Sequence, residues 1–291
     1  MGMLQRVRGA LRRIDTLLTR WADLSPDVSP PPAAPGFEDF FRGLSADAAA
    51  REYIQVHLPR LARTMMLVPT PTGVRRALEL GAYMQMTPAL KILCGYPELR
   101  AADLGQPGCS VRKAVALKDG EFTIDIDLFD VERDRFPYPD SHFSLVLCCE
   151  LLEHLLSDPM HMFVEIRRIL EPGGRLLLTT PNCASLTSLA SLLEGRSNPQ
   201  VYSRYEREKS GDRPHVREYT AREIEQLMTA AGFEIEHLST ERIAGRDEAR
   251  WVRDLLIGNH LDYSLRGEQT YCLAVLNPAV AVDRYPEWLY A

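Results

Sequence analysis

The chain has 291 residues, of which 45% are hydrophobic and 25% are charged. These fractions are typical of a folded globular protein and exclude a chain that is disordered along its whole length. The formal net charge of −6 excludes the overall basic excess that is typical of nucleic-acid-binding proteins. We therefore expect no nucleic-acid partner.

The sequence indicates neither export nor membrane insertion. Apolar runs of about 18 residues, which a transmembrane helix needs, do not occur, and the N-terminus lacks the apolar core of a signal peptide. The six cysteines form no C-x-x-C pair, which favours reduced thiols. We expect a cytoplasmic protein.

Three regions precede the main domain. Residues 1–24 are predicted to form a basic amphipathic helix, because apolar residues within 3–23 recur at spacings of three and four while arginines occupy the other faces. Such a helix packs on its own domain, contacts a second subunit or lies on an anionic membrane, and these alternatives stay open. Residues 25–36 hold five prolines and are predicted to be a stiff linker. Residues 37–73 are predicted to form a helical cover for the main domain.

The main domain, residues 74–291, alternates predicted strands and helices. Strands are predicted at 76–80, 99–103, 122–128, 143–149, 175–180, 233–238 and 271–276, and helices at 88–93, 159–170 and 220–231. This alternation favours an α/β fold with a doubly wound, mostly parallel sheet. Two insertions interrupt it, at about 183–214 and 241–270, and we expect the second to add a helix before the last strand.

Acidic residues stand at or just after the ends of successive predicted strands: Glu79, Asp103, Asp130 and Glu150. In sheets of this class the ligand lies beyond the carboxyl ends of the strands. Carboxylates there suit a ligand that is cationic or rich in hydroxyl and amino donors. A carboxylate after the second strand is placed to accept hydrogen bonds from both hydroxyls of a ribose.

An ordered set of segments resembles a known family. The set is ALELGA (77–82), Asp103, DVERDRFPYPDSHFSLVLCCELLEHLLSDP (130–159), RRILEPGGRLLLTTPN (167–182) and HVREYTAREIEQLMTAAGFEI (215–235). In this order the segments resemble the class I S-adenosylmethionine-dependent methyltransferases of the bacterial methyltransferase-domain kind. The resemblance implies a Rossmann-like, mostly parallel sheet of seven strands with an antiparallel last strand. It also implies that S-adenosylmethionine is the cofactor.

The resemblance assigns cofactor roles position by position. Asp103 matches the acidic residue that holds the ribose, Asp130 and the Val131 backbone match the pair that contacts the adenine, and Gly81 matches the close approach to the methionine part. The set implied to contact the cofactor is Glu79, Gly81, Ala82, Tyr83, Asp103, Leu104, Asp130, Val131, Cys149 and Glu150.

The first motif departs from the family at two positions, where further glycines are usual and this chain has Tyr83 and Gln85. Glycine serves there because it adopts positive φ angles and permits close approach of the backbone. The departure puts the geometry of the methionine end in doubt and leaves a non-catalytic relative with a degenerate pocket as the alternative. A nicotinamide-dependent oxidoreductase shares the fold class, but the G-x-G-x-x-G fingerprint is missing after the first strand.

The segment ELLEH and a distant histidine supply candidate catalytic groups. His154 and His215 are candidate general bases, because imidazole titrates near neutral pH. Glu150, Glu153, His154 and His215 are the residue types that hold a divalent metal, and related ExxEH segments do so in the ubiquinone-type O-methyltransferases. The expected role is nonetheless a polar cap without metal. The resulting hypothesis is methyl transfer to a small-molecule or glycan acceptor, with an O-methyl product favoured. The first insertion is the expected acceptor lid.

Overall fold

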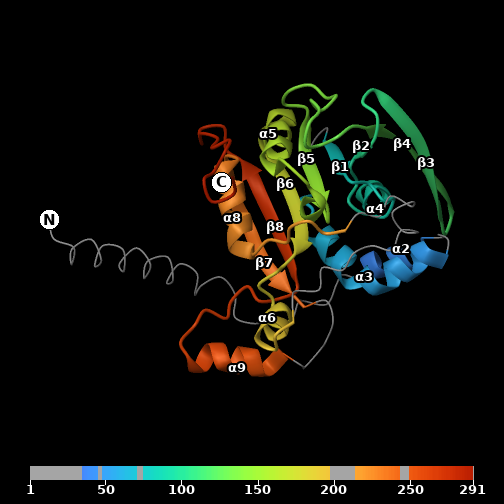
Figure 1. Cartoon of the computed structure of the whole chain (residues 1–291). Coiled ribbons are helices and arrows are strands. Elements are labelled where there is room, and N and C mark those ends of the chain that lie inside the picture. The colour runs from blue at the N-terminus through green and yellow to red at the C-terminus, as the bar shows by residue number, and fades with distance from the viewer. Residues whose placement is uncertain (1–34, 45–47, 71–74, 197–213, 243–248, 291) are drawn as a thin grey trace.

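The computed structural model describes residues 35–44, 48–70, 75–196, 214–242 and 249–290. The predicted helix at 1–24 and all but the last two residues of the predicted linker lie outside the described residues. So does most of the expected lid, residues 197–213. A central sheet runs through the described part, with α5 and α8 on one side and α2, α3 and α4 on the other (Figure 1).

In the described part of the chain, eight strands form one sheet in the order β3-β4-β2-β1-β5-β6-β8-β7. The four pairings that join β1, β2, β4, β5 and β6 are parallel, and those of β3, β7 and β8 are antiparallel. The bounds are β1 Arg76–Leu80, β2 Glu98–Asp103, β3 Cys109–Leu117, β4 Gly120–Leu128, β5 Phe143–Cys149, β6 Leu170–Pro181, β7 Phe233–Glu241 and β8 Gln269–Leu276. The Rossmann-like, mostly parallel sheet is confirmed.

The sheet has one strand more than the seven predicted. The extra strand, β3, is an edge strand that forms a hairpin with β4 through Gly120, whose φ is +133°. Its residues are exposed or half-exposed along its whole length. Because neither face of β3 is buried, it lacks the apolar run that identified the central strands.

The predicted helices at 88–93, 159–170 and 220–231 are present, each with bounds within two residues of the prediction, whereas α6 was not predicted. Their bounds are α2 Pro35–Arg42, α3 Ala48–Met66, α4 Met86–Ile92, η1 Leu152–His154, α5 Pro159–Ile169, α6 Leu186–Leu193, α8 Ala221–Ala230 and α9 Arg250–Gly258. α8 begins with the expected capping box, in which Thr220 and Glu223 bond each other's backbone N–H groups. α9 is the helix expected before the last strand, and α2 begins inside the stretch predicted as linker. Among the described helices, none combines the length and apolar character needed to cross a bilayer.

Two apolar layers hold the sheet in place. Along β5, Val146 and Cys148 face the layer that contains α5 and α8, whereas Leu145 and Leu147 face the layer that contains α2, α3 and α4. Successive side chains of a strand point to opposite faces, so a strand buried on both sides is apolar throughout. Packing on both faces therefore holds the central strands in position. Because β1, β2, β4 and β5 run parallel, their carboxyl ends lie at the same edge of the sheet.

Candidate active site

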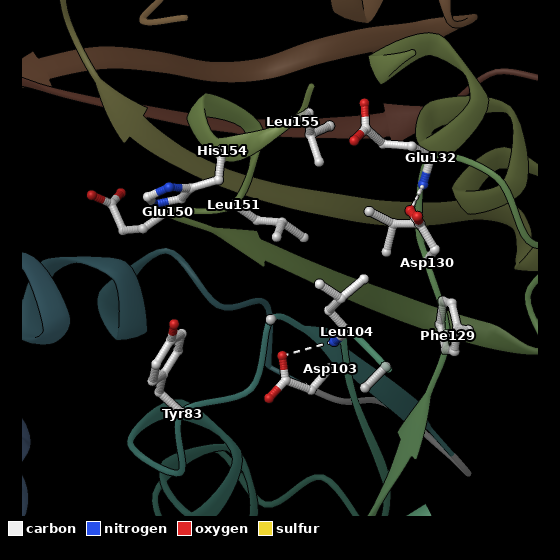
Figure 2. A pocket seen from close by; sticks show the side chains of 13 residues that line it. Tyr83, Asp103, Leu104, Phe129, Asp130, Glu132, Glu150, Leu151, His154 and Leu155 are labelled. Carbon is white, nitrogen blue, oxygen red and sulfur yellow. Dashed lines mark hydrogen bonds between the residues drawn. The ribbon is translucent and has the colours of Figure 1, made fainter. Parts of the chain in front are cut away.

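A pocket opens at this edge of the sheet (Figure 2). Its empty volume is about 730 Å³, including open solvent at its mouth. The residues that line it follow the ends of β1, β2, β4 and β5, as expected for a ligand site in a sheet of this class. They are Gly81, Tyr83, Ala102, Asp103, Leu104, Phe129, Asp130, Val131, Glu132, Glu150, Leu151, His154 and Leu155.

Most of the predicted cofactor residues line this pocket: Gly81, Tyr83, Asp103, Leu104, Asp130, Val131 and Glu150. Glu79, Ala82 and Cys149 do not. Ala82 is fully buried in a small apolar cluster with Ala101 and Ile126. Cys149 packs against the layer that contains α3, and burial raises the pKa of its thiol to about 12.

Glu79 is buried at the end of β1 and is not among the residues that line the pocket. Its side chain is buried and accepts a short hydrogen bond from the Thr87 hydroxyl. Burial raises the pKa of Glu79 to about 7, and the negative charge of Asp103 adds to this rise. Glu79 therefore links β1 to α4.

Asp103 ends β2 and presents its carboxylate to the pocket. Oδ1 accepts a hydrogen bond of 2.8 Å from the backbone N–H of Leu104, and Oδ2 lies 3.3 Å from Nζ of Lys113. The side chain is 36% exposed, so it remains accessible to a ligand. The hydrogen bond to Oδ1 orients the carboxylate, and the remaining lone pairs of both oxygens can accept hydrogen bonds from a ligand.

Asp130 follows β4, lines the pocket and also caps the turn that comes after it. Oδ1 accepts from the backbone N–H of Glu132 at 2.9 Å, which makes Asp130 a cap of the turn that follows. The pocket lining thus holds the carboxylates of Asp103 and Asp130, besides Glu132 and Glu150, together with the apolar residues Leu104, Phe129, Val131 and Leu155. Hydrogen-bond acceptors beside apolar side chains fit a nucleoside, which has hydroxyl and amino donors and an aromatic ring.

Sequence reasoning did not single out Glu132, although it lines the pocket. Its carboxylate accepts hydrogen bonds from the backbone N–H groups of Leu156, Ser157 and Asp158 at 2.9, 2.6 and 2.7 Å. These bonds fix the turn between η1 and α5, which begins at the pocket residue Leu155. The one feature of the sequence that could have indicated Glu132 is its place in the run Asp130-Val131-Glu132, directly after a predicted strand.

Glu150 has a left-handed backbone, with φ of +52°, directly after β5. Its Oε1 accepts from the Thr179 hydroxyl at 2.8 Å and from the Gln269 amide at 2.7 Å. The same oxygen lies 3.7 Å from Nη1 of Arg60. The side chain is therefore tied to β6, β8 and α3 at once, which stabilises a backbone conformation that is uncommon outside glycine.

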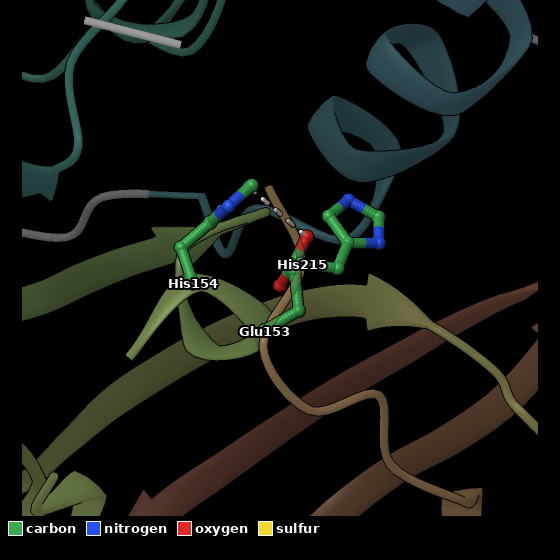
Figure 3. A group of neighbouring side chains, drawn as sticks. All are labelled: Glu153, His154 and His215. Carbon is green, nitrogen blue, oxygen red and sulfur yellow. Dashed lines mark ion pairs between the residues drawn. The ribbon is translucent and has the colours of Figure 1, made fainter. Parts of the chain in front are cut away.

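Glu153, His154 and His215 come together beside the pocket (Figure 3). One potential ligand atom from each residue lies within 4.8 Å of the others. Glu153 is fully buried, and its Oε2 accepts from Thr180 at 2.9 Å while Oε1 lacks a hydrogen-bond partner in the described structure. Burial raises the pKa of Glu153 well above its usual value. Glu150, the fourth predicted candidate for a metal, does not belong to this group.

The two histidine rings meet edge to face, with centroids 4.9 Å apart and an interplanar angle of 78°. His154 lines the pocket, and its Nδ1 lies 3.2 Å from the backbone carbonyl of Pro214. Nδ1 of His215 lies 2.8 Å from Oε1 of Glu218, a carboxylate that sequence reasoning did not single out. A carboxylate on Nδ1 fixes the tautomer of a neutral imidazole and leaves Nε2 as the proton acceptor.

The loop after β1 takes a path of its own at the positions of the missing glycines. Gly81 has a φ of +71°, and the second left-handed residue is Met84, with a φ of +68°. Tyr83 lines the pocket, yet it is 66% exposed, so its ring does not fill the interior of the site. The positive φ angles therefore fall on positions other than Tyr83 and Gln85.

Strand order, pocket position and lining together define a Rossmann-like domain that binds a nucleoside-containing cofactor. A family model described as a methyltransferase domain matches residues 88–238, just over half of the chain. The chain therefore belongs to this methyltransferase family, in agreement with the resemblance to class I S-adenosylmethionine-dependent methyltransferases seen in the sequence. S-adenosylmethionine is the cofactor of this protein.

The chain is similar to two curated relatives over part of their length and to a solved structure over its whole length. A probable S-adenosylmethionine-dependent methyltransferase from Mycolicibacterium smegmatis is 32% identical over 35% of this chain and 33% of its own. A malonyl-[acyl-carrier protein] O-methyltransferase from Alcanivorax borkumensis is 31% identical over 49% of this chain and 48% of its own. The chain thus spans half or less of the length of these curated relatives. A methyltransferase structure from Archaeoglobus fulgidus is 16% identical, with a TM-score of 0.49, and covers 79% of this chain and 100% of its own.

Proposed function

We propose that the protein transfers a methyl group from S-adenosylmethionine to an oxygen atom of a small-molecule or glycan acceptor. The observation that carries the proposal is the meeting of Asp103 and Asp130 in one pocket that also contains His154. The malonyl-[acyl-carrier protein] relative, whose name is that of an O-methyltransferase, agrees with oxygen as the acceptor atom.

The pocket residues would divide the cofactor between them. Asp103 would accept hydrogen bonds from the ribose hydroxyls, Asp130 and the Val131 backbone would contact the adenine, and Gly81 would border the amino-acid part. The bound cofactor supplies a methyl group that is already activated by its attachment to a sulfonium. The chain's own contribution is then alignment of the acceptor, which is worth about 7–11 kcal/mol in favourable cases.

Of the two candidate bases, His154 lines the pocket, whereas His215 lies beside it and has a carboxylate partner. Nδ1 of His215 faces the Glu218 carboxylate, so Nε2 would take the proton from an acceptor hydroxyl and Glu218 would stabilise the resulting imidazolium. His154 would contact the acceptor from the pocket wall. General-base catalysis of this kind contributes roughly 10²–10⁴-fold to the rate.

Glu153, His154 and His215 are also the set that would hold a divalent cation if the reaction used one. The Oε1 of Glu153, which has no hydrogen-bond partner in the described structure, and the approach of the three side chains fit such an ion, whereas the burial that raises the pKa of Glu153 favours the metal-free cap. Turnover before and after treatment with a chelator distinguishes the two. Activity that survives the chelator assigns these residues to proton transfer and packing alone.

Calorimetry with S-adenosylmethionine and a methyl-transfer screen test the proposal. We expect micromolar-range binding and a loss of at least about tenfold in affinity for Asp103→Asn, because hydrogen bonds to a charged group contribute about 1.5–3 kcal/mol each. Asp125→Asn is the matched control, since Asp125 lies on the exposed part of β4. An absence of binding at millimolar cofactor would refute the proposal.

The screen uses labelled S-adenosylmethionine, fractionated extract and mass detection of the product. Product formation excludes a non-catalytic scaffold relative, the alternative that Tyr83 and Gln85 raise. Cofactor binding without product from any fraction would favour that alternative. A product methylated on nitrogen or carbon would contradict the assignment of oxygen.

A further inference from the structure

His215, the candidate base with a carboxylate partner, lies on residues 214–218, which belong to no helix or strand. A base on such a segment needs contacts that fix its backbone, because connecting segments are more mobile than the elements they join. Two hydrogen bonds supply part of this support. The backbone N–H groups of Val216 and Arg217 both donate to the carbonyl of Glu153, at 2.7 and 3.2 Å. The segment is thereby joined to η1 beside the pocket.

The side chain of Arg217 holds the same segment from another direction. Its Nη2 donates to Oε1 of Glu223 at 3.0 Å, and Glu223 also completes the capping box of α8. The guanidinium lies over the Tyr219 ring, 4.9 Å from the centroid, and over the Trp288 ring at 5.9 Å. Trp288 belongs to the tail segment, residues 277–290 after β8. Arginine suits this place, because its planar group donates hydrogen bonds at its edge while its faces contact aromatic rings.

The tail segment lies beside α8 and is anchored before it reaches Trp288 (Figure 1). The Asp283 N–H donates to the carbonyl of Ala230 at the end of α8, 2.8 Å away. Further along, Arg284 pairs with both carboxylate oxygens of Asp158, the cap of α5. The Trp288 ring therefore meets its partner from a backbone that is fixed at two helices.

Arg217 is not among the residues that line the pocket, so it would act through His215 rather than on a ligand. Glu218, whose Oε1 lies 2.8 Å from Nδ1 of His215, follows Arg217 directly in the chain. A displacement of Arg217 therefore disturbs both members of the His215–Glu218 pair, and a displacement of about 1 Å can cost about 10²-fold in rate. We propose that Arg217 is a positioning residue for His215 and that the Trp288 ring helps to hold it. This role rests on the proposed function, in which His215 takes the proton from the acceptor.

Nitrogen-15 NMR of the His215 ring tests this role without an acceptor. At alkaline pH, where imidazole is neutral, the spectrum shows which ring nitrogen carries the proton. We expect the proton on Nδ1 in wild-type protein, facing Glu218, and a mixture of both tautomers in Arg217→Gln. His215→Asn assigns the signal. Arg222→Gln is the matched control, because Arg222 pairs with Asp262 and its loss should leave the tautomer unchanged.

Turnover measures the same role once the screen has supplied an acceptor fraction. The rate is divided by the number of sites that bind S-adenosylhomocysteine, so unfolded protein does not count. Arg217→Gln should lower this rate at least about tenfold and leave the affinity for S-adenosylhomocysteine unchanged. Arg217→Lys should recover part of the loss, because it keeps the charge that faces Glu223. Trp288→Phe should retain more turnover than Trp288→Ala, because it keeps a ring beside Arg217.

A wild-type proton on Nε2 would overturn the proposal, and so would an unchanged tautomer or an unchanged turnover in Arg217→Gln. If Arg217→Gln does not fold, Trp288→Ala takes its place, since Trp288 is 37% exposed, and the same unchanged readouts would rule the role out. Wild-type protein that binds S-adenosylhomocysteine but yields no product from any fraction contradicts the proposed function instead. The tautomer in the variants then decides whether Arg217 positions His215.

Discussion

Replacement of Glu132 by glutamine should destabilise the protein and loosen the pocket together. The carboxylate accepts three backbone N–H bonds of 2.6–2.9 Å from residues 156–158, and the residue is 8% exposed. The amide of glutamine keeps one acceptor oxygen, but its NH₂ group opposes a backbone N–H. At least one charge-assisted bond is lost, and we expect the free energy of unfolding to fall by about 2 kcal/mol.

Urea denaturation followed by circular dichroism measures this change. Glu121→Gln is the matched control, because Glu121 is exposed at the start of β4 and should change stability by less than about 0.5 kcal/mol. Calorimetry should show weaker binding of S-adenosylhomocysteine, since the freed turn starts at Leu155 in the pocket wall. A Glu132→Gln protein with wild-type stability and wild-type binding would show that these three bonds do not hold the turn.

Three further predictions follow from the site. Gly81→Ala should cost about 1–2 kcal/mol in unfolding experiments, from its φ of +71° rather than from a clash, because the added Cβ would lie 3.5 Å from Leu151. Burial raises the pKa of Glu79 from its usual 4.5 to about 7, so the stability that its protonated form contributes should be lost as pH rises through this range. Glu79→Gln should remove this pH dependence of the free energy of unfolding, measured by denaturation at several pH values. His215→Asn should lower kcat by roughly 10²–10⁴-fold with unchanged S-adenosylhomocysteine binding, and an equal loss of binding would contradict its role as a base.

The central strands were predictable because burial on both faces leaves a continuous apolar run. Residues 143–149 were predicted from such a run with the bounds that the structure gives, and residues 76–80 were predicted with the correct bounds although Arg76 and Glu79 interrupt the apolar pattern. β3 was missed for the opposite reason, since an exposed edge strand carries mixed residues and gains its order from pairing with β4. Its Lys113 then reaches Asp103, a contact that no spacing in the sequence indicates.

The sequence predicts which strand ends border the pocket, but not which side chains line it. Parallel strands bring Asp103 and Asp130 to one edge, and the structure places both in one pocket wall. Which side chain lines the pocket depends on local geometry, and Glu79 and Cys149 are not among the lining residues. The carboxylate partners Glu132 and Glu218 act on backbone and imidazole groups from neighbouring turns, and hydrogen bonds of that kind leave no periodic trace in a sequence.

Tyr83, one of the two residues that stand where the family has glycine, lies in the wall of the pocket. A loop with glycine at alternate positions would let its backbone surround the amino-acid part of the cofactor. Here the left-handed residues are Gly81 and Met84, and Tyr83 extends into solvent. The loop therefore follows a different backbone path from the one that glycine at alternate positions would permit, with its positive φ angles at Gly81 and Met84.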